Sequence, residues 1–149
     1  MKVLTILVPT DLSPDAGAAL VKARDLARAL GSRIVILHAY RVDLPLATPE
    51  LGGGFVLPDR FYEELRASAT SQVEALAAAI VKEGVKAEGI AVEDRPAQAI
   101  VAAAKRLPAD LIVMGTRGLT GLKHVMLGSV ADRVIRTASC PVLTVKATE

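Results

Sequence analysis

Short runs of apolar residues alternate along the chain with longer amphipathic segments. The runs Val3–Val8, Arg33–Ala39 and Leu111–Met114 show no clean alternation of polar and apolar positions, which is typical of strands buried on both faces of a parallel sheet. Val85–Val92 alternates, with charged residues between small apolar ones, and this pattern favours a strand at the edge of a sheet. A last apolar run predicts a strand over Val142–Val145.

Four segments between these runs carry apolar residues at helical spacing. In the first, Ser13 stands before Pro14, which is the order of an N-cap and a proline at the first helical position, and Gly31 ends the helix. The second covers roughly Arg60–Glu83, and the third begins at Pro96. The fourth follows a glycine-rich loop near the C-terminus.

The alternation of strands and helices predicts an α/β fold with a doubly wound parallel sheet of five strands in the order 3-2-1-4-5 and about four helices on its two faces. Ligands bind such sheets at the carboxyl ends of the strands, where the connections reverse direction, here between strands one and four. Those ends are Pro9–Asp11 and Met114–Gly115. The length of the chain predicts a single domain over residues 1–149.

One glycine-rich stretch, Asp110–Thr137, carries the candidate chemistry. It leads from a buried strand into a helix, and α/β sheets bind anions at such places through free backbone N–H groups and the helix dipole. The sequence there has neither a P-loop motif nor a G-x-G-x-x-G motif that opens directly into a helix. Its pattern is Gly115-x2-Gly118-x9-Gly128-Ser129.

Ser129 is predicted to begin the last helix, because Asp132 stands three residues on with the spacing of a capping box. The Ser129 hydroxyl and the amides of Ser129 and Val130 would then reach a phosphate oxygen. The apolar face expected for this helix consists of Val130, Val134, Ile135 and Ala138.

This pattern resembles the nucleotide-binding motif of the universal stress protein family, in its ATP-binding branch, and the resemblance covers most of the chain. It implies an adenine nucleotide alpha hydrolase-like fold and ATP as the ligand, with or without Mg²⁺. Arg95 departs from the family pattern, because many members carry glycine before the proline that opens the third helix. The phosphate contacts implied by the resemblance map onto Gly115, Gly118, Gly128 and Ser129.

Further candidate residues lie at the ends of the other strands. By resemblance, the corner of Pro9, Thr10 and Asp11 lies under the adenosine, and Ala39 offers backbone groups to the adenine edge. The Asp11 carboxylate would contact the ribose hydroxyls or a phosphate-bound Mg²⁺, and a turn or helix cap is its alternative role. Met114 would flank the base, with ordinary core filling as the alternative.

Several polar residues have less specific roles. Arg117 lies in the glycine loop and would neutralise phosphate, with a solvated surface position as the alternative. We interpret Lys123 and His124 as solvated, His38 as a hydrogen-bonded core histidine and Cys140 as structural. No second His or Cys stands at ligand spacing, so the sequence predicts no zinc site.

Composition narrows the classes of function. A net charge of +2 demands neither a nucleic-acid nor a membrane partner, and no apolar run approaches the roughly 18 residues of a transmembrane helix. Hydrophobic residues make up 52% of the chain but aromatic residues only 3%, so the core must be aliphatic. The single cysteine excludes an intrachain disulfide, which favours a reducing compartment. We therefore expect a cytoplasmic protein.

Three functions follow as hypotheses. The favoured one is a regulatory stress-response protein in which bound ATP orders Tyr40–Pro58 or Leu119–Leu127 and changes contacts with an unknown protein partner. By resemblance it is a homodimer, joined through the strand Val142–Val145, which would otherwise be an open edge. The alternative is a weak ATPase or phosphoryl or nucleotidyl transferase, although no convincing base lies near the loop. RNA binding through Gly118–Gly121 is disfavoured, because aromatic residues are scarce.

Overall fold

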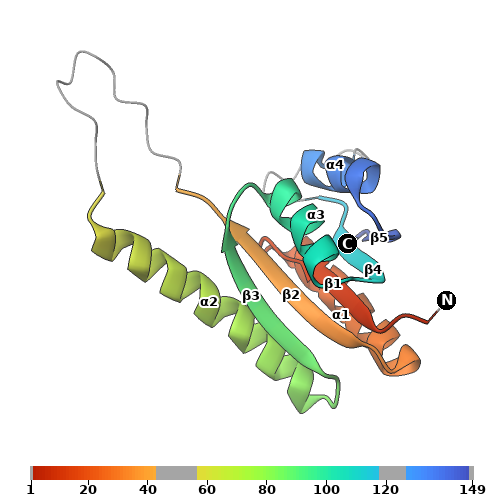
Figure 1. Cartoon of the computed structure of the whole chain (residues 1–149). Helices are drawn as coiled ribbons and strands as arrows, with labels where there is room; N and C mark the ends of the chain where they lie inside the picture. The colour runs from red at the N-terminus through yellow and green to blue at the C-terminus, as the bar shows by residue number, and fades with distance from the viewer. Residues whose placement is uncertain (1, 43–56, 118–126, 148–149) are drawn as a thin grey trace.

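Five parallel strands form one sheet in the order β3-β2-β1-β4-β5, as predicted (Figure 1). The computed structural model describes residues 2–42, 57–117 and 127–147, and the helices and strands named here lie in these ranges. The strands are β1 (Thr5–Pro9), β2 (Arg33–Tyr40), β3 (Ala87–Glu93), β4 (Leu111–Gly115) and β5 (Val142–Val145). The helices are α1 (Pro14–Leu30), α2 (Asp59–Lys82), α3 (Pro96–Arg106) and α4 (Ser129–Thr137).

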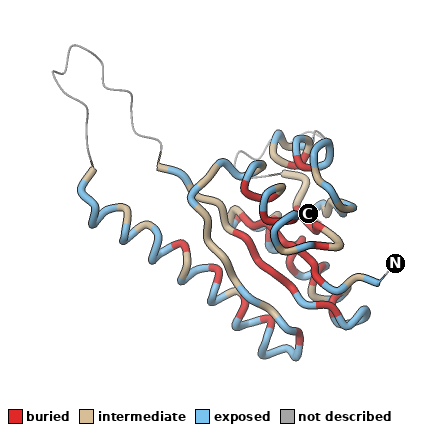
Figure 2. Tube along the Cα trace, viewed as in Figure 1, coloured by how far each residue is buried: buried red, intermediate tan, exposed pale blue. Residues whose placement is uncertain are grey.

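The sheet is covered on both faces, and each face has its own aliphatic cluster (Figure 2). Successive residues of a strand point to opposite faces, so Ile6 and Val8 of β1 pack with α1 and α2, whereas Leu7 packs with α3 and α4. All three side chains are fully buried. The buried character predicted for the first two strands and for β4 is therefore confirmed.

The strand at the start of the chain is shifted relative to its apolar run. β1 begins at Thr5 rather than Val3, and Leu4 is 53% exposed. The Leu4 amide donates to the Asp110 carboxylate at 2.8 Å, so a side chain takes the hydrogen bond that a strand neighbour would otherwise take. The run was therefore a correct indicator of a strand and a poor indicator of its first residue.

The apolar face predicted for the last helix is partly wrong. Val134 is fully buried, but Ile135 is 45% exposed and Ala131, which the prediction omitted, is 3% exposed. The helix lies over the β4–β5 side of the sheet, next to α3 (Figure 1), so only the stripe facing α3 and the sheet is covered. Ile135 lies outside that stripe.

The Asp110 carboxylate joins the start of β1 to the connection between α3 and β4. Its Oδ2 accepts the amides of Thr5 at 2.9 Å and Leu4 at 2.8 Å. These two backbone hydrogen bonds, Thr5 first, hold the pKa of the carboxyl below its ordinary value, because they stabilise the charged form.

Replacing Asp110 by Asn is expected to lower the melting temperature at pH 7. The pKa of Asp110 is lower in the folded protein than in the unfolded chain, so its contribution is complete above the ordinary aspartate pKa of about 4 and is lost as the pH falls through the lowered folded value. The difference between Asp110→Asn and the native chain should shrink in thermal melts below about pH 4. The exposed Glu63→Gln serves as the control variant, and a pH-independent difference for Asp110→Asn would contradict the assignment.

Candidate functional site

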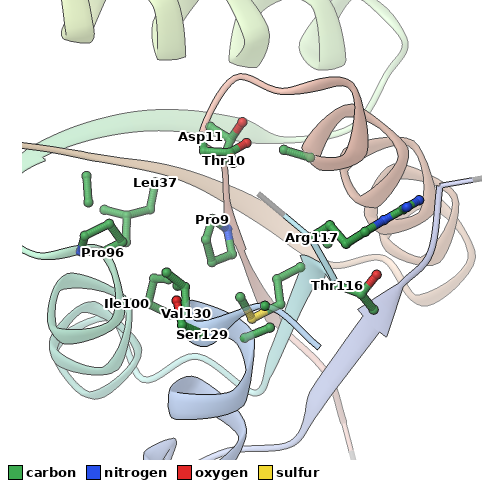
Figure 3. Close-up of a pocket in the computed structure, with 16 residues that line it drawn as sticks. Pro9, Thr10, Asp11, Leu37, Pro96, Ile100, Thr116, Arg117, Ser129 and Val130 are labelled. Carbon is green, nitrogen blue, oxygen red and sulfur yellow. The ribbon is translucent and has the colours of Figure 1, made fainter. Parts of the chain in front are cut away.

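A cavity of about 270 Å³ opens where β1 and β4 end and the chain turns to opposite faces of the sheet (Figure 3). This is the switch point at which doubly wound sheets bind ligands, and the volume is slightly below the usual range of about 300–1,000 Å³. The described residues that line it are Pro9, Thr10, Asp11, Ala16, Leu37, Ala39, Pro96, Ile100, Met114, Gly115, Thr116, Arg117, Gly128, Ser129, Val130 and Ala131.

Ten of the eleven candidate residues identified in the sequence therefore share one cavity. Gly118 lies outside the described residues, as do Lys123, His124 and most of the segments 40–58 and 119–127. Sequence reasoning missed six lining residues, five of them apolar. They are Ala16, Leu37, Pro96, Ile100, Thr116 and Ala131.

The corner after β1 is held by short side-chain hydrogen bonds. Thr10 Oγ1 accepts the Leu12 amide at 3.0 Å, Asp11 Oδ1 accepts the Ser13 amide at 3.0 Å, and Ser13 Oγ accepts the Ala16 amide at 3.3 Å. Ser13 is thus the N-cap of α1, as predicted. The turn role of Asp11 is present, and the same side chain borders the cavity.

Leu12 has a left-handed backbone conformation, with φ of 65°. This conformation costs a residue with a Cβ atom roughly 1–2 kcal/mol. Strained residues persist where the surrounding structure over-determines them, often beside functional sites. Here the hydrogen bonds of Thr10 and Asp11 impose the strain directly beside the cavity.

The start of α4 differs from the predicted capping box. Gly128 is the N-cap, Ser129 is the first helical residue, and no side chain accepts a first-turn amide. Asp132 instead binds Arg136, with Arg136 Nε 3.0 Å from the carboxylate. The capping-box prediction is wrong because a capping role needs Ser129 one position earlier, outside the helix.

Three consecutive amides at the start of α4 are consequently unpaired within the described part of the chain. They belong to Ser129, Val130 and Ala131, and the first amide with an acceptor is that of Asp132, which donates to Gly128 O at 2.9 Å. Ala131 is only 3% exposed, and buried amides are nearly always satisfied by protein, water or ligand. All three residues line the cavity, so the amides are available to an anion there.

A hydrogen bond closes the segment between β4 and α4. The Gly128 amide donates to Thr116 O at 2.7 Å, and the Thr116 amide donates to Val145 O of β5 at 3.1 Å. The start of α4 is thereby tied to the end of β4. Gly128 has φ of −62°, which any residue adopts, so its backbone conformation does not require glycine.

The end of β2 presents backbone groups to the cavity. The Thr10 amide donates to Leu37 O at 2.8 Å, so the peptide groups of Leu37 face β1. Backbone groups alternate in direction along a strand, and Ala39 therefore faces the same side, beyond the last β1 residue paired with β2, which is Pro9. The N–H and C=O of Ala39 border the cavity as a donor and acceptor pair.

The cavity wall beside Ala39 is apolar. Pro96 and Ile100 of α3, together with Leu37 and Met114, give it its hydrophobic surface (Figure 3). Leu37 and Met114 belong to the cluster on the α3–α4 face. The available sequence signal was the period of two along β2, which puts Leu37 on the same face as Ala39.

Two polar residues have structural roles. The half-buried His38 has Nδ1 2.9 Å from Thr10 O, which agrees with its interpretation as a hydrogen-bonded histidine. Arg95 is the N-cap of α3 with φ of −68°, so replacing the usual glycine costs no left-handed strain. Arg95 does not line the cavity.

The charged groups of the described lining are Asp11 and Arg117. Arg117 Nε lies 3.2 Å from Oδ2 of Asp15, in the first turn of α1. Among the described residues, no group of three or more His, Cys, Asp and Glu side chains is arranged to hold a metal ion. In the same part of the chain, no helix has the length and apolar content needed to cross a membrane.

These features define a doubly wound α/β protein with a cavity at its switch point. The chain belongs to the universal stress protein family, whose model matches residues 3–146. A universal stress protein of Methanocaldococcus jannaschii is 37% identical over 141 residues, which are 95% of this chain and 81% of the relative.

Two solved structures of the family carry adenine compounds. A universal stress protein in complex with cAMP has a TM-score of 0.70 and 25% identity, with 99% of this chain and 100% of the other covered. The Archaeoglobus fulgidus universal stress protein in complex with dAMP has a TM-score of 0.65 and 26% identity, with 97% and 98% covered. The family model and the relatives confirm that the chain is a universal stress protein family member, as the resemblance implied.

The strain at Leu12 is directly testable. Leu12→Asn is expected to raise the free energy of unfolding by about 1 kcal/mol, because Asn tolerates the left-handed conformation. Leu12 is already 40% exposed, so little apolar burial is lost. Leu30→Asn is the matched control, since Leu30 is similarly exposed but helical, and it should lower stability by roughly 0.5 kcal/mol. Equal destabilisation of both variants in urea titrations would contradict the strain.

Proposed function

We propose that this protein binds an adenine nucleotide, ATP with or without Mg²⁺, in the cavity between β1 and β4, and acts as a regulatory stress-response protein of the cytoplasm. The observation that carries the proposal is the run of unpaired amides at the start of α4, in three residues that line the cavity. An anionic phosphate satisfies such amides and interacts favourably with the helix dipole. Gly128 lets the phosphate approach the backbone closely, and the Ser129 hydroxyl adds a donor.

The opposite end of the cavity supports adenine as the base. The apolar wall formed with Pro96, Ile100 and Met114 would cover the faces of a purine. The Ala39 N–H and C=O would pair with the adenine ring nitrogen and exocyclic amine, because adenine offers an acceptor beside a donor. The complexes of family members with cAMP and dAMP support the same class of ligand.

The remaining candidate residues join these two ends. Pro9 and Thr10 would lie under the ribose. The Asp11 carboxylate would accept hydrogen bonds from the ribose hydroxyl groups or hold a phosphate-bound Mg²⁺. Gly115 and Gly118 would complete the phosphate contacts. Bound nucleotide would then act by changing the order of the segments 40–58 or 119–127 and hence contacts with a protein partner.

The charged groups near the cavity support binding over turnover. Asp11 Oδ1 already accepts the Ser13 amide, and Arg117 is paired with Asp15. Phosphoryl transfer needs a positioned base and a cationic clamp in addition to phosphate amides. An ATPase or phosphoryl or nucleotidyl transferase is the alternative: several ATP turnovers per minute, abolished by Asp11→Ala, would favour it.

We also propose that two copies of the chain join through β5. This strand is at the edge of the sheet, and open edges present unpaired backbone groups to a partner strand. Leu143 of β5 is 39% exposed and Ile135 of the adjacent α4 is 45% exposed. A second copy related by a two-fold axis would cover both.

The phosphate contacts predict that the purified protein carries an adenine nucleotide, released by denaturation and identified by chromatography and mass spectrometry. Ser129→Ala is expected to weaken ATP affinity about 10- to 100-fold, because it removes one hydrogen bond to a charged group. Gly128→Val should abolish binding by blocking the amides. Ser71→Ala, on the exposed face of α2, is the matched control.

Circular dichroism must show that the three variants stay folded. Native nucleotide content in both Gly128→Val and Ser129→Ala would end the assignment of phosphate to the start of α4. Loss in Ser71→Ala as well would indicate an effect unrelated to the cavity.

The dimer is tested by sedimentation velocity. Leu143→Lys should shift the native dimer to a monomer, because the new charges would be buried without partners. Val81→Lys, at an exposed apolar position on α2 (52% exposed), should leave the dimer intact. A monomeric native protein at micromolar concentration, or a Leu143→Lys dimer, would contradict the arrangement.

A further inference from the structure

Arg117 is the one cationic residue of the described cavity lining, and its charge is already engaged. Its Nε lies 3.2 Å from Oδ2 of Asp15, and among the described residues Asp15 is the acidic residue with which it forms an ion pair. The two side chains are 29% and 21% exposed. The pair is therefore partly shielded from water, and Asp15 competes for the guanidinium with any anion in the cavity.

Asp15 also directs Arg117 away from the centre of the cavity. Figure 3 shows the Arg117 side chain extending away from Pro9 and Ile100, toward α1. Asp15 belongs to the first turn of that helix. The guanidinium thus lies at the rim of the cavity.

The first turn of α1 is packed closely against this rim. A Cβ atom at Gly115 would lie 3.3 Å from the carbonyl oxygen of Asp15, which leaves α1 little freedom to move toward β4. The Ser13 cap holds the same turn through the Ala16 amide. The backbone that carries Asp15 is therefore held in place, whereas Arg117 has a long side chain that can change its rotamer.

We propose that Asp15 is a specificity-determining residue of the nucleotide site: it holds the Arg117 guanidinium at the rim and so reduces the advantage of ligands with longer phosphate chains. The proposal rests on the proposed function of the cavity. A phosphate chain that reaches the rim must displace Asp15 to bind Arg117, whereas a monophosphate held by the amides of α4 does not. Asp15 thereby reduces the factor by which the site would bind ATP more tightly than AMP.

The test is the dissociation constant for AMP divided by that for ATP, both measured by titration calorimetry in EDTA. A higher ratio means a stronger preference for ATP. Asp15→Asn keeps the size of the side chain and removes its charge. The ratio should rise about two- to five-fold, the equivalent of releasing one partly exposed ion pair. A structural defect would weaken the binding of both ligands and leave the ratio of their dissociation constants unchanged.

Two further variants show whether Asp15 acts through Arg117. Asp25→Asn removes the same charge from α1 at a surface cluster with Arg24 and Arg28, and it should leave the ratio at the native value. In an Arg117→Gln background, Asp15→Asn should raise the ratio by less than half as much as in the native background. An equal rise in both backgrounds would mean that the carboxylate acts through space, and would overturn the proposal.

The remaining outcomes separate this proposal from the proposed function. If the native protein binds AMP and ATP but Asp15→Asn leaves their ratio unchanged, the role of Asp15 is refuted and the nucleotide site stands. If the native protein binds neither ligand, the proposed function fails and this inference fails with it.

Discussion

Unpaired backbone amides at the start of α4 are the constraint on which the candidate site depends. Ordinary helices satisfy part of their first turn with a side-chain cap, as Ser13 does for α1. Gly128 has no side chain to offer α4, and one of the unpaired amides belongs to the buried Ala131. An anion at this place would supply the missing acceptor, so the same feature that weakens the isolated helix favours a bound phosphate.

The rest of the fold keeps that helix start in position. The hydrogen bond from Gly128 to Thr116 and the ladder between β4 and β5 tie it to the sheet. On the other side of the cavity, the corner after β1 is rigid because Thr10 and Asp11 hold Leu12 in a strained conformation. The cavity is therefore largely formed before any ligand arrives, which lowers the entropic cost of binding.

Much of the candidate site was predictable because its residues follow strands directly. Apolar runs mark where β1 and β4 end, and in a parallel sheet those ends meet at one edge, so Asp11 and Gly115 were expected to be neighbours. The wall from α3 was not predictable in this way. Pro96 and Ile100 read as an ordinary helix start and core face, and only the packing of α3 beside α4 brings them to the cavity.

The sequence by itself determined the strand and helix order, the sheet topology and the place of the candidate anion site, because these depend on local periodicity and on the general rules of parallel sheets. Tertiary structure alone decided which side chains share a hydrogen bond or an ion pair. Ser129 lost its expected cap role through a shift of one helical position, and Arg117 found Asp15, about a hundred residues away in the chain. Such pairings depend on differences of a few tenths of an ångström in the distances between elements. The spacing of residues in the sequence carries no information at that scale.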